Sequence, residues 1–183
     1  MKRIIMVLLL ALAFTAVLCA SAPITADSPA LITSFGQSAD ANFVKLLFDR
    51  LKLDYEYSIS ILPSAVDWSK IKALVCVLGG SQKGLGQAGL DMASEIDRCT
   101  KLLSDARAHG AKVIGIHLGG QDRMGPNSKA FIAMAAETDY MIVKRDTGVE
   151  DYFVPLCSSA GIPIDVAGKT ADVSNLLKEI FGK

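Results

Sequence analysis

The sequence predicts one α/β domain, a three-layer, doubly wound fold whose mostly parallel sheet has five to six strands and carries helices on both faces. Strand-like and helix-like segments alternate six times over residues 30–183. Several strand-like segments are nearly continuous apolar runs, which is typical of strands that are covered on both faces. Because each intervening helix carries the chain back to the same starting edge, the alternation favours parallel pairing. Both common doubly wound strand orders fit this pattern.

The start of the chain is predicted to be a secretory signal peptide. Lys2 and Arg3 precede an apolar run over residues 4–18, and small residues follow it. The run has 15 residues, whereas a helix that spans a membrane needs roughly 20. Loss of the two basic residues would change the formal charge from zero to about −2.

Cleavage is expected after Ala26, which leaves residues 27–183 as a single Rossmann-like or flavodoxin-like domain. Lipid anchoring at Cys19 is not expected, because Leu18 occupies a position where a lipidation site needs a small residue. The mature chain is therefore expected outside the cytoplasm, either secreted or periplasmic.

The predicted strands are short segments that are either continuously apolar or alternate between apolar and polar residues, with turn-forming residues at each end. Residues 71–78 form the most continuous apolar run, and Pro63 closes the segment before it. In chain order, the six predicted strands are residues 30–34, 55–61, 71–78, 112–118, 140–143 and 164–167.

The predicted helices show apolar residues at spacings of three and four. Asp40 is expected to cap the first helix and Thr170 the last. Pro126 and Pro155 are each expected in the first turn of a helix, where a missing N–H does little harm. In chain order, the predicted helices begin near residues 40, 91, 126, 152 and 170.

The connections after the predicted strands are long and rich in Gly, Ser, Gln and charge, whereas those after the helices are short. In a parallel sheet the long connections all emerge at the carboxyl edge, where open α/β sheets bind ligands. Residues 79–90 are expected to form the longest of these glycine-rich loops. The long connections are residues 35–39, 79–90, 119–125 and 144–150.

We therefore predict a site for a small polar or anionic ligand at this edge. Glycine and serine residues would offer backbone N–H and hydroxyl donors, and Lys83 and Arg123 would supply charge. The predicted ligand-binding residues are Gly36, Gln37, Ser38, Gly79, Gly80, Ser81, Lys83, Gly84, Gly86, His117, Gly120 and Arg123.

Our first interpretation is an exported, non-catalytic binding protein that could serve a membrane transporter, and the second is a docking module for another envelope protein. A third is a nucleotide- or flavin-binding protein or a hydrolase. Residues 84–89 match G-x-G-x-x-G, although residues 79–83 separate the motif from its strand. Ser81, His117 and Asp122 could meet at the same edge as parts of a hydrolase site.

Composition argues against several other classes of protein. The balanced charge provides no basic footprint for nucleic acid. After the signal peptide three cysteines remain, Cys76, Cys99 and Cys157, and an odd number excludes a fully paired disulfide framework. The scattered cysteines and the two histidines have no metal-ligand spacing, so neither a metal nor a cofactor is predicted.

Two stretches carry a resemblance to known proteins. Residues 33–38, which lead into an amphipathic helix, are similar to the phosphate loop of flavodoxins. Over residues 33–40 and 79–86 the chain resembles a family of small, uncharacterised exported bacterial proteins. That resemblance extends over nearly all of residues 30–183; it implies a Rossmann-like fold and no known activity.

Overall fold

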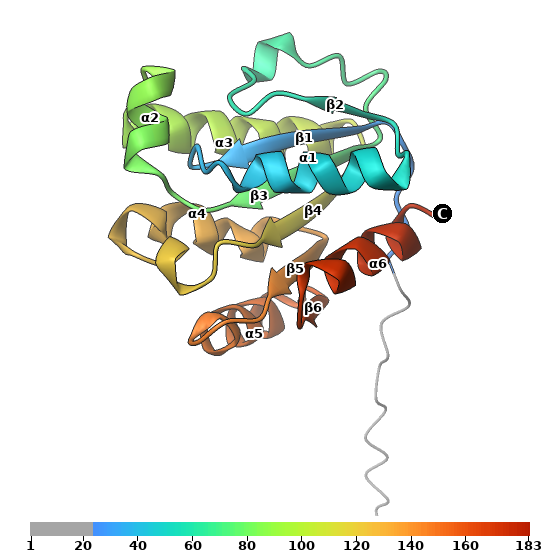
Figure 1. The fold of residues 1–183 in the computed structure, drawn as a ribbon. Coiled ribbons are helices and arrows are strands. Elements are labelled where there is room, and N and C mark those ends of the chain that lie inside the picture. Colours follow the sequence, from blue (N-terminus) through green and yellow to red (C-terminus); the bar gives the residue numbers. More distant parts are fainter. Residues whose placement is uncertain (1–23) are drawn as a thin grey trace, which may run out of the picture.

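The computed structural model describes residues 24–183, so Cys19 and most of the predicted signal peptide lie outside the described residues. The predicted fold class is confirmed: all six strands pair in parallel, in the order β2-β1-β3-β4-β5-β6 (Figure 1). The order reverses between β1 and β3, as in flavodoxin-type sheets. The strands are β1 (Ala30–Phe35), β2 (Tyr55–Tyr57), β3 (Ala73–Leu78), β4 (Lys112–His117), β5 (Tyr140–Lys144) and β6 (Ile164–Ala167).

Helices cover both faces of the sheet. One face packs against α1 and α6, and the opposite face packs against α3, α4 and α5 (Figure 1). The helices are α1 (Asp40–Leu51), α2 (Gln82–Ala88), α3 (Met92–Ala108), α4 (Lys129–Ala133), α5 (Val149–Ala160) and α6 (Thr170–Ile180). Within residues 24–183, none of them combines the length and the apolar character that crossing a membrane requires.

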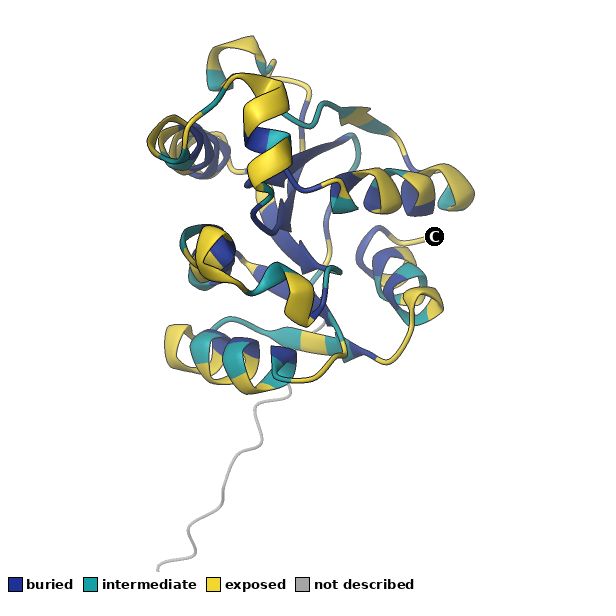
Figure 2. Cartoon of the chain, turned by 60° about the vertical axis from the view of Figure 1, so that its left-hand side comes forward, coloured by how far each residue is buried: buried dark blue, intermediate teal, exposed yellow. Residues whose placement is uncertain are grey.

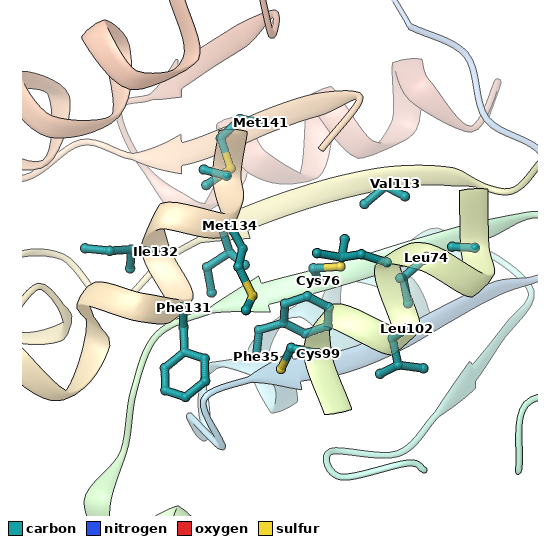
Figure 3. Packing of buried hydrophobic residues seen from close by; sticks show 14 of the residues in the cluster. Phe35, Leu74, Cys76, Cys99, Leu102, Val113, Phe131, Ile132, Met134 and Met141 are labelled. Carbon is teal, nitrogen blue, oxygen red and sulfur yellow. The ribbon is translucent and has the colours of Figure 1, made fainter. Parts of the chain in front are cut away.

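The core consists of two apolar layers, one on each side of the sheet. Every residue of β1 and of β3 is buried, and exposed residues lie on the outer sides of the helices (Figure 2). Under α3 and α4, Phe35 of β1 lies near Cys99 and Phe131 (Figure 3). Burying one such phenylalanine contributes roughly 1.5–3 kcal/mol, so these layers hold the strands firmly.

The register brings the carboxyl ends of the central strands to one level. Phe35 of β1 lies beside Leu78 of β3, and Val77 lies beside Ile116 of β4. The loops that follow these three strands therefore start side by side.

The amino edge of the sheet is closed by short turns. There, Trp68 is buried, and its ring stacks on His109 at the end of α3, with centroids 6.0 Å apart. Ala26 is also buried, and its N–H donates to Ile180 O at 2.9 Å. Cleavage after Ala26 would remove this last contact.

Two predicted segments differ from the structure. The second strand ends at Tyr57, because the chain then bends so that Ile59 O accepts hydrogen bonds from Ser34 N and Thr33 Oγ1. The predicted loop over residues 79–90 contains α2. Ser81 Oγ caps this helix by accepting from Gly84 N at 3.1 Å.

The predicted helix starts were also partly wrong. Ala39 and Lys169, not Asp40 and Thr170, are the cap residues of α1 and α6, and each predicted cap is instead the first helical residue. Pro155 lies inside α5, because Gly148 adopts a left-handed conformation (φ 74°) and starts the helix earlier than expected.

Candidate functional site

The site lies where the strand order reverses, at the carboxyl ends of β1 and β3. Backbone hydrogen bonds join the two loops that start there: Gly79 N donates to Phe35 O at 3.0 Å, and Ser81 N donates to Gly36 O at 2.8 Å. Gln37 and Gly80 add an isolated antiparallel bridge. The two loops therefore form one continuous floor above the sheet.

Glycines allow the segments around the floor to pack closely against one another. A Cβ atom on Gly80 would lie 2.0 Å from Asn127 O, and one on Gly84 would lie 2.0 Å from Gln37 O. The Gly80 N–H donates to Ser128 Oγ at 2.9 Å. Because any side chain at Gly84 would push α2 away from the β1 loop, glycine lets the helix pack directly on that loop.

A buried ion pair on α3 lies beneath the floor. Glu95 is fully buried and Arg98 is 3% exposed, and Arg98 Nε donates to Glu95 Oε2 at 2.7 Å. The guanidinium also donates to the carbonyl oxygens of Ser34 and Ile61. A buried charge pair of this kind is stable when its remaining donors and acceptors are also satisfied.

The carboxylate of this pair also holds the β1 loop. Glu95 Oε1 accepts from Gly36 N at 2.9 Å and from Gln37 Nε2 at 3.0 Å. Gly36 and Gln37 have φ values of 103° and 60°, a region that residues other than glycine seldom occupy. Sequence reasoning missed Glu95 and Arg98. Their i, i+3 spacing was the only available signal, and it is equally typical of an exposed helix pair.

A cavity of about 470 Å³ opens above this floor. It lies between the β1 loop, the start of α1, the segment after β2, and α2. Within residues 24–183, its lining includes two cations and no carboxylate. The lining residues are Gln37, Ala39, Asn42, Ile59, Ser60, Ser81, Lys83, Gly84, Gln87, Ala88 and Arg123.

The structure brings part of the predicted set together at this cavity. The predicted residues that line it are Gln37, Ser81, Lys83, Gly84 and Arg123. Gly36, Gly79 and Gly80 lie in the floor and hold the loops together. Gly86 lies on α2, and a Cβ atom added there would have no other atom of residues 24–183 within 4 Å. Ser38 is buried and does not line the cavity.

Arg123 reaches the cavity from a 3₁₀ turn after β4, Gln121–Arg123. Its Nε lies 3.8 Å from Asp40 Oδ2, and the same carboxylate oxygen accepts from Ser38 Oγ at 2.8 Å. Lys83 has no carboxylate partner within 4.0 Å in the part of the chain that the structure describes. Among these residues, therefore, one cation of the cavity is unpaired and the other is loosely paired.

His117 does not face this cavity. It is fully buried, with Nδ1 2.9 Å from Leu78 O and Nε2 3.2 Å from Gly120 O. Burial lowers the pKa of His117, and a neutral imidazole can donate from only one of its two nitrogens. His117 thus supports the β4 loop from within.

Gly120 belongs to a separate cluster at the ends of β4 and β5. A Cβ atom on Gly120 would lie 2.0 Å from Asp146 Oδ2. Asp146 accepts from Thr147 N at 2.8 Å and from Gln121 N at 3.1 Å. These two backbone donors lower the pKa of the Asp146 carboxyl.

The catalytic alternatives do not assemble in this geometry. The Ser81 hydroxyl caps α2, and both nitrogens of the His117 ring contact backbone carbonyls, so the two side chains form no hydrogen bond with each other. Asp122 is exposed. The G-x-G-x-x-G motif forms most of α2 rather than a tight turn between strand and helix.

Metal binding and thiol chemistry find no support among residues 24–183. No group of three His, Cys, Asp or Glu side chains in that range could hold a metal ion. Cys76, Cys99 and Cys157 are buried and free. Burial raises the pKa of all three thiols, that of Cys157 to about 11, which makes them poor nucleophiles.

Three comparisons relate the chain to known proteins. A family described as "Domain of unknown function (DUF6305)" matches residues 27–181. No curated protein matches the sequence. The psychrotrophic esterase EstA from Pseudoalteromonas sp., solved with monoethylphosphonate as inhibitor, is similar at 10% identity and a TM-score of 0.36, over 84% of this chain and 96% of that chain. That TM-score is too low to support an argument about activity, and the flavodoxin loop similarity is not confirmed.

Proposed function

The chain belongs to the DUF6305 family, whose function is unknown, and we propose from the cavity at the β1–β3 edge that it binds a small anionic metabolite without transforming it. The observation that carries this proposal is the charge of the cavity lining. Lys83 and Arg123 are both present, and no Asp or Glu of residues 24–183 lines the cavity. Two cations that line one concave surface raise the local concentration of carboxylates and phosphates.

Neutral groups in the cavity support the same ligand class. Ser81 Oγ accepts from Gly84 N, which leaves its hydroxyl hydrogen free to donate. Ala39, the cap residue of α1, also lines the cavity and contributes no side-chain hydrogen bond to the helix. The Asp40 carboxylate in the first turn of α1 offsets the positive end of the helix dipole, so the attraction for an anion rests on Lys83 and Arg123.

The size of the cavity supports a metabolite rather than a macromolecule. A volume of about 470 Å³ falls within the range of roughly 300–1,000 Å³ that is usual for small-molecule sites. The proposal includes no chemical step, because the buried ring of His117 is bonded to backbone carbonyls and forms no hydrogen bond with Ser81. Export and association with a transporter stay predictions.

The test is a thermal-shift and calorimetric titration of the purified chain with inorganic phosphate, succinate, malate and citrate. We expect at least one of these anions to raise the melting temperature. A ligand at a hundred times its Kd stabilises the folded state by about 2.7 kcal/mol. The Lys83→Ala and Arg123→Ala variants should each weaken binding about ten-fold or more, which corresponds to loss of one charge-assisted contact.

Lys112→Ala is the matched control, since Lys112 is exposed at the start of β4 on the opposite edge; it should leave binding unchanged. The proposal would be overturned if no anion shifted the melting temperature, or if the shift persisted in both cavity variants.

A second candidate function is docking to another protein, which the outer surface of α1 favours. Phe43 and Leu46, one turn apart on that helix, are 59% and 49% exposed. Exposed apolar side chains that adjoin each other often mark an interface. The test is photo-crosslinking in the producing cells from position 46, with position 101 on α3 as control. A product specific to position 46 would support docking, and equal products from both positions would oppose it.

A further inference from the structure

The Gln37 carboxamide has one defined orientation. Glu95 also receives hydrogen bonds from Gly36 N and from the Arg98 guanidinium, as expected of an ionised carboxylate. Because such a carboxylate can only accept hydrogen bonds, the group of Gln37 that faces it must be the amide nitrogen, at 3.0 Å. The carbonyl Oε1 of Gln37 must then point away from Glu95.

Among residues 24–183, no protein donor is bonded to Gln37 Oε1, and the buried side-chain polar atom without a partner is Trp68 Nε1. Gln37 Oε1 is therefore accessible to solvent. Gln37 lines the cavity, and the whole residue is only 3% exposed.

We infer that Gln37 Oε1 faces the cavity, that Glu95 is a positioning residue that fixes this oxygen there as an acceptor, and that the cavity consequently selects a hydroxylated anion. This inference rests on the proposed function. A ligand with only negative oxygens would leave Gln37 Oε1 without a donor once water is displaced, which is costly for a buried polar group. A hydroxy acid or a hydroxylated phosphate ester satisfies both the cations and the acceptor.

The surroundings of Glu95 keep this orientation fixed. Arg98 holds the carboxylate through two contacts, at 2.7 and 2.8 Å, and is itself bonded to the backbone at Ser34 and Ile61. A glutamine at position 95 could either donate or accept, so the Gln37 amide could then rotate to present its nitrogen. The selectivity would be lost even though Gln37 itself is unchanged.

The experiment compares anions that differ by one hydroxyl group. Malate is paired with succinate, and glycerol 3-phosphate is paired with propyl phosphate, in calorimetric titrations of the wild-type chain. We expect the hydroxylated member to bind about three- to ten-fold more tightly, as one neutral hydrogen bond allows. The carboxylate pair and the phosphate pair show separately which charged group the site prefers.

Two variants test the roles of the residues. Gln37→Met keeps the length of the side chain and removes the acceptor; it should reduce the affinity ratio within each anion pair to about one. Glu95→Gln should also abolish the ratio. Asp97→Asn, exposed on the same helix, is the control and should preserve it. A merely structural role of Glu95 would weaken both members of a pair equally.

The outcomes separate this inference from the proposed function. If no anion binds the wild-type chain, the proposed function fails and this inference fails with it. If anions bind but the members of each pair bind equally, only this inference is overturned. The inference is also overturned if the Gln37→Met variant still prefers the hydroxylated anion of each pair. This variant tests the inference even if Glu95→Gln fails to fold.

Discussion

The carboxyl edge of the sheet has two halves that use their polar residues differently. At the ends of β4 and β5, the Asp146 carboxylate accepts hydrogen bonds from backbone N–H groups, and both ring nitrogens of His117 contact backbone carbonyls. At the ends of β1 and β3, Glu95 and Arg98 form their hydrogen bonds below the floor, with each other and with the β1 loop. Above that floor, Lys83 has no carboxylate partner among the described residues.

This difference shows that polar loops at the same edge of a sheet can either contact nearby backbone groups or leave side chains open to a cavity. In the β4–β5 half, His117 and Asp146 contact nearby backbone groups, and the pocket lined there by Leu118 and Lys144 is smaller, at about 140 Å³. The β1–β3 half leaves a cavity of about 470 Å³, because a buried pair on α3 holds the loops from beneath and frees the upper surface.

The largest expected effect comes from removing the support under the β1–β3 half. Arg98→Ala would leave the Glu95 carboxylate buried and unpaired, which typically costs about 3–5 kcal/mol. Lys101→Ala breaks the exposed pair with Asp97 on the same helix and should cost less than about 1 kcal/mol. Urea denaturation measures both. A loss below about 1 kcal/mol for Arg98→Ala would show that the floor does not depend on the pair.

The next effect concerns the glycines of the same half. Gly80→Ala places a methyl group 2.0 Å from a backbone oxygen of Asn127, and we expect a loss of about 1–3 kcal/mol from the forced shift. Gly86→Ala meets no neighbouring atom among the described residues and should stabilise α2 by up to about 1 kcal/mol, since alanine favours a helix. Thermal unfolding of the two variants tests the contrast. Equal effects would mean that the loop after β3 does not pack against Asn127 as closely as the structure shows.

A smaller effect tests the β4–β5 half through pH. Burial lowers the pKa of His117 below its ordinary value of 6.5, so the unfolded chain takes up this proton at higher pH than the folded chain does. The stability gained by keeping His117 neutral is therefore complete above pH 6.5 and is lost as pH falls through the folded pKa. Asp40 and Arg123 act on the ring in opposite directions, raising and lowering its pKa respectively.

We expect His117→Asn to flatten the pH dependence of the free energy of unfolding between about pH 6.5 and 5. Asp146 does not interfere in this window. Its pKa is lowered from 3.8 by the N–H groups of Thr147 and Gln121, so its contribution is lost only at more acidic pH. An unchanged slope in the variant would show that His117 is not what couples this half to pH.

Sequence patterns predicted the scaffold well and the site only in part. The continuous apolar run of β3 reflects burial on both faces of the sheet, and such a run can be recognised in the sequence. Strand order depends on which helix crosses to which face, and no local pattern encodes that. The convergence of Lys83 and Arg123 followed from the edge rule for parallel sheets.

The missed features share a physical cause. Gly84 and Gly86 disfavour a helix, yet α2 forms because Ser81 caps it and Leu85 is buried. Likewise, the periodicity of α3 showed which side faces the core. It did not show that Glu95 would lie directly under the loop of a distant strand.

The position of Trp68 has a practical consequence for these measurements. The chain contains one tryptophan, and it lies at the amino edge, where its ring stacks on His109 and is absent from the cavity lining. Its fluorescence should change when the domain unfolds and should stay constant when the cavity fills. One optical signal thus follows denaturation without interference from bound ligand.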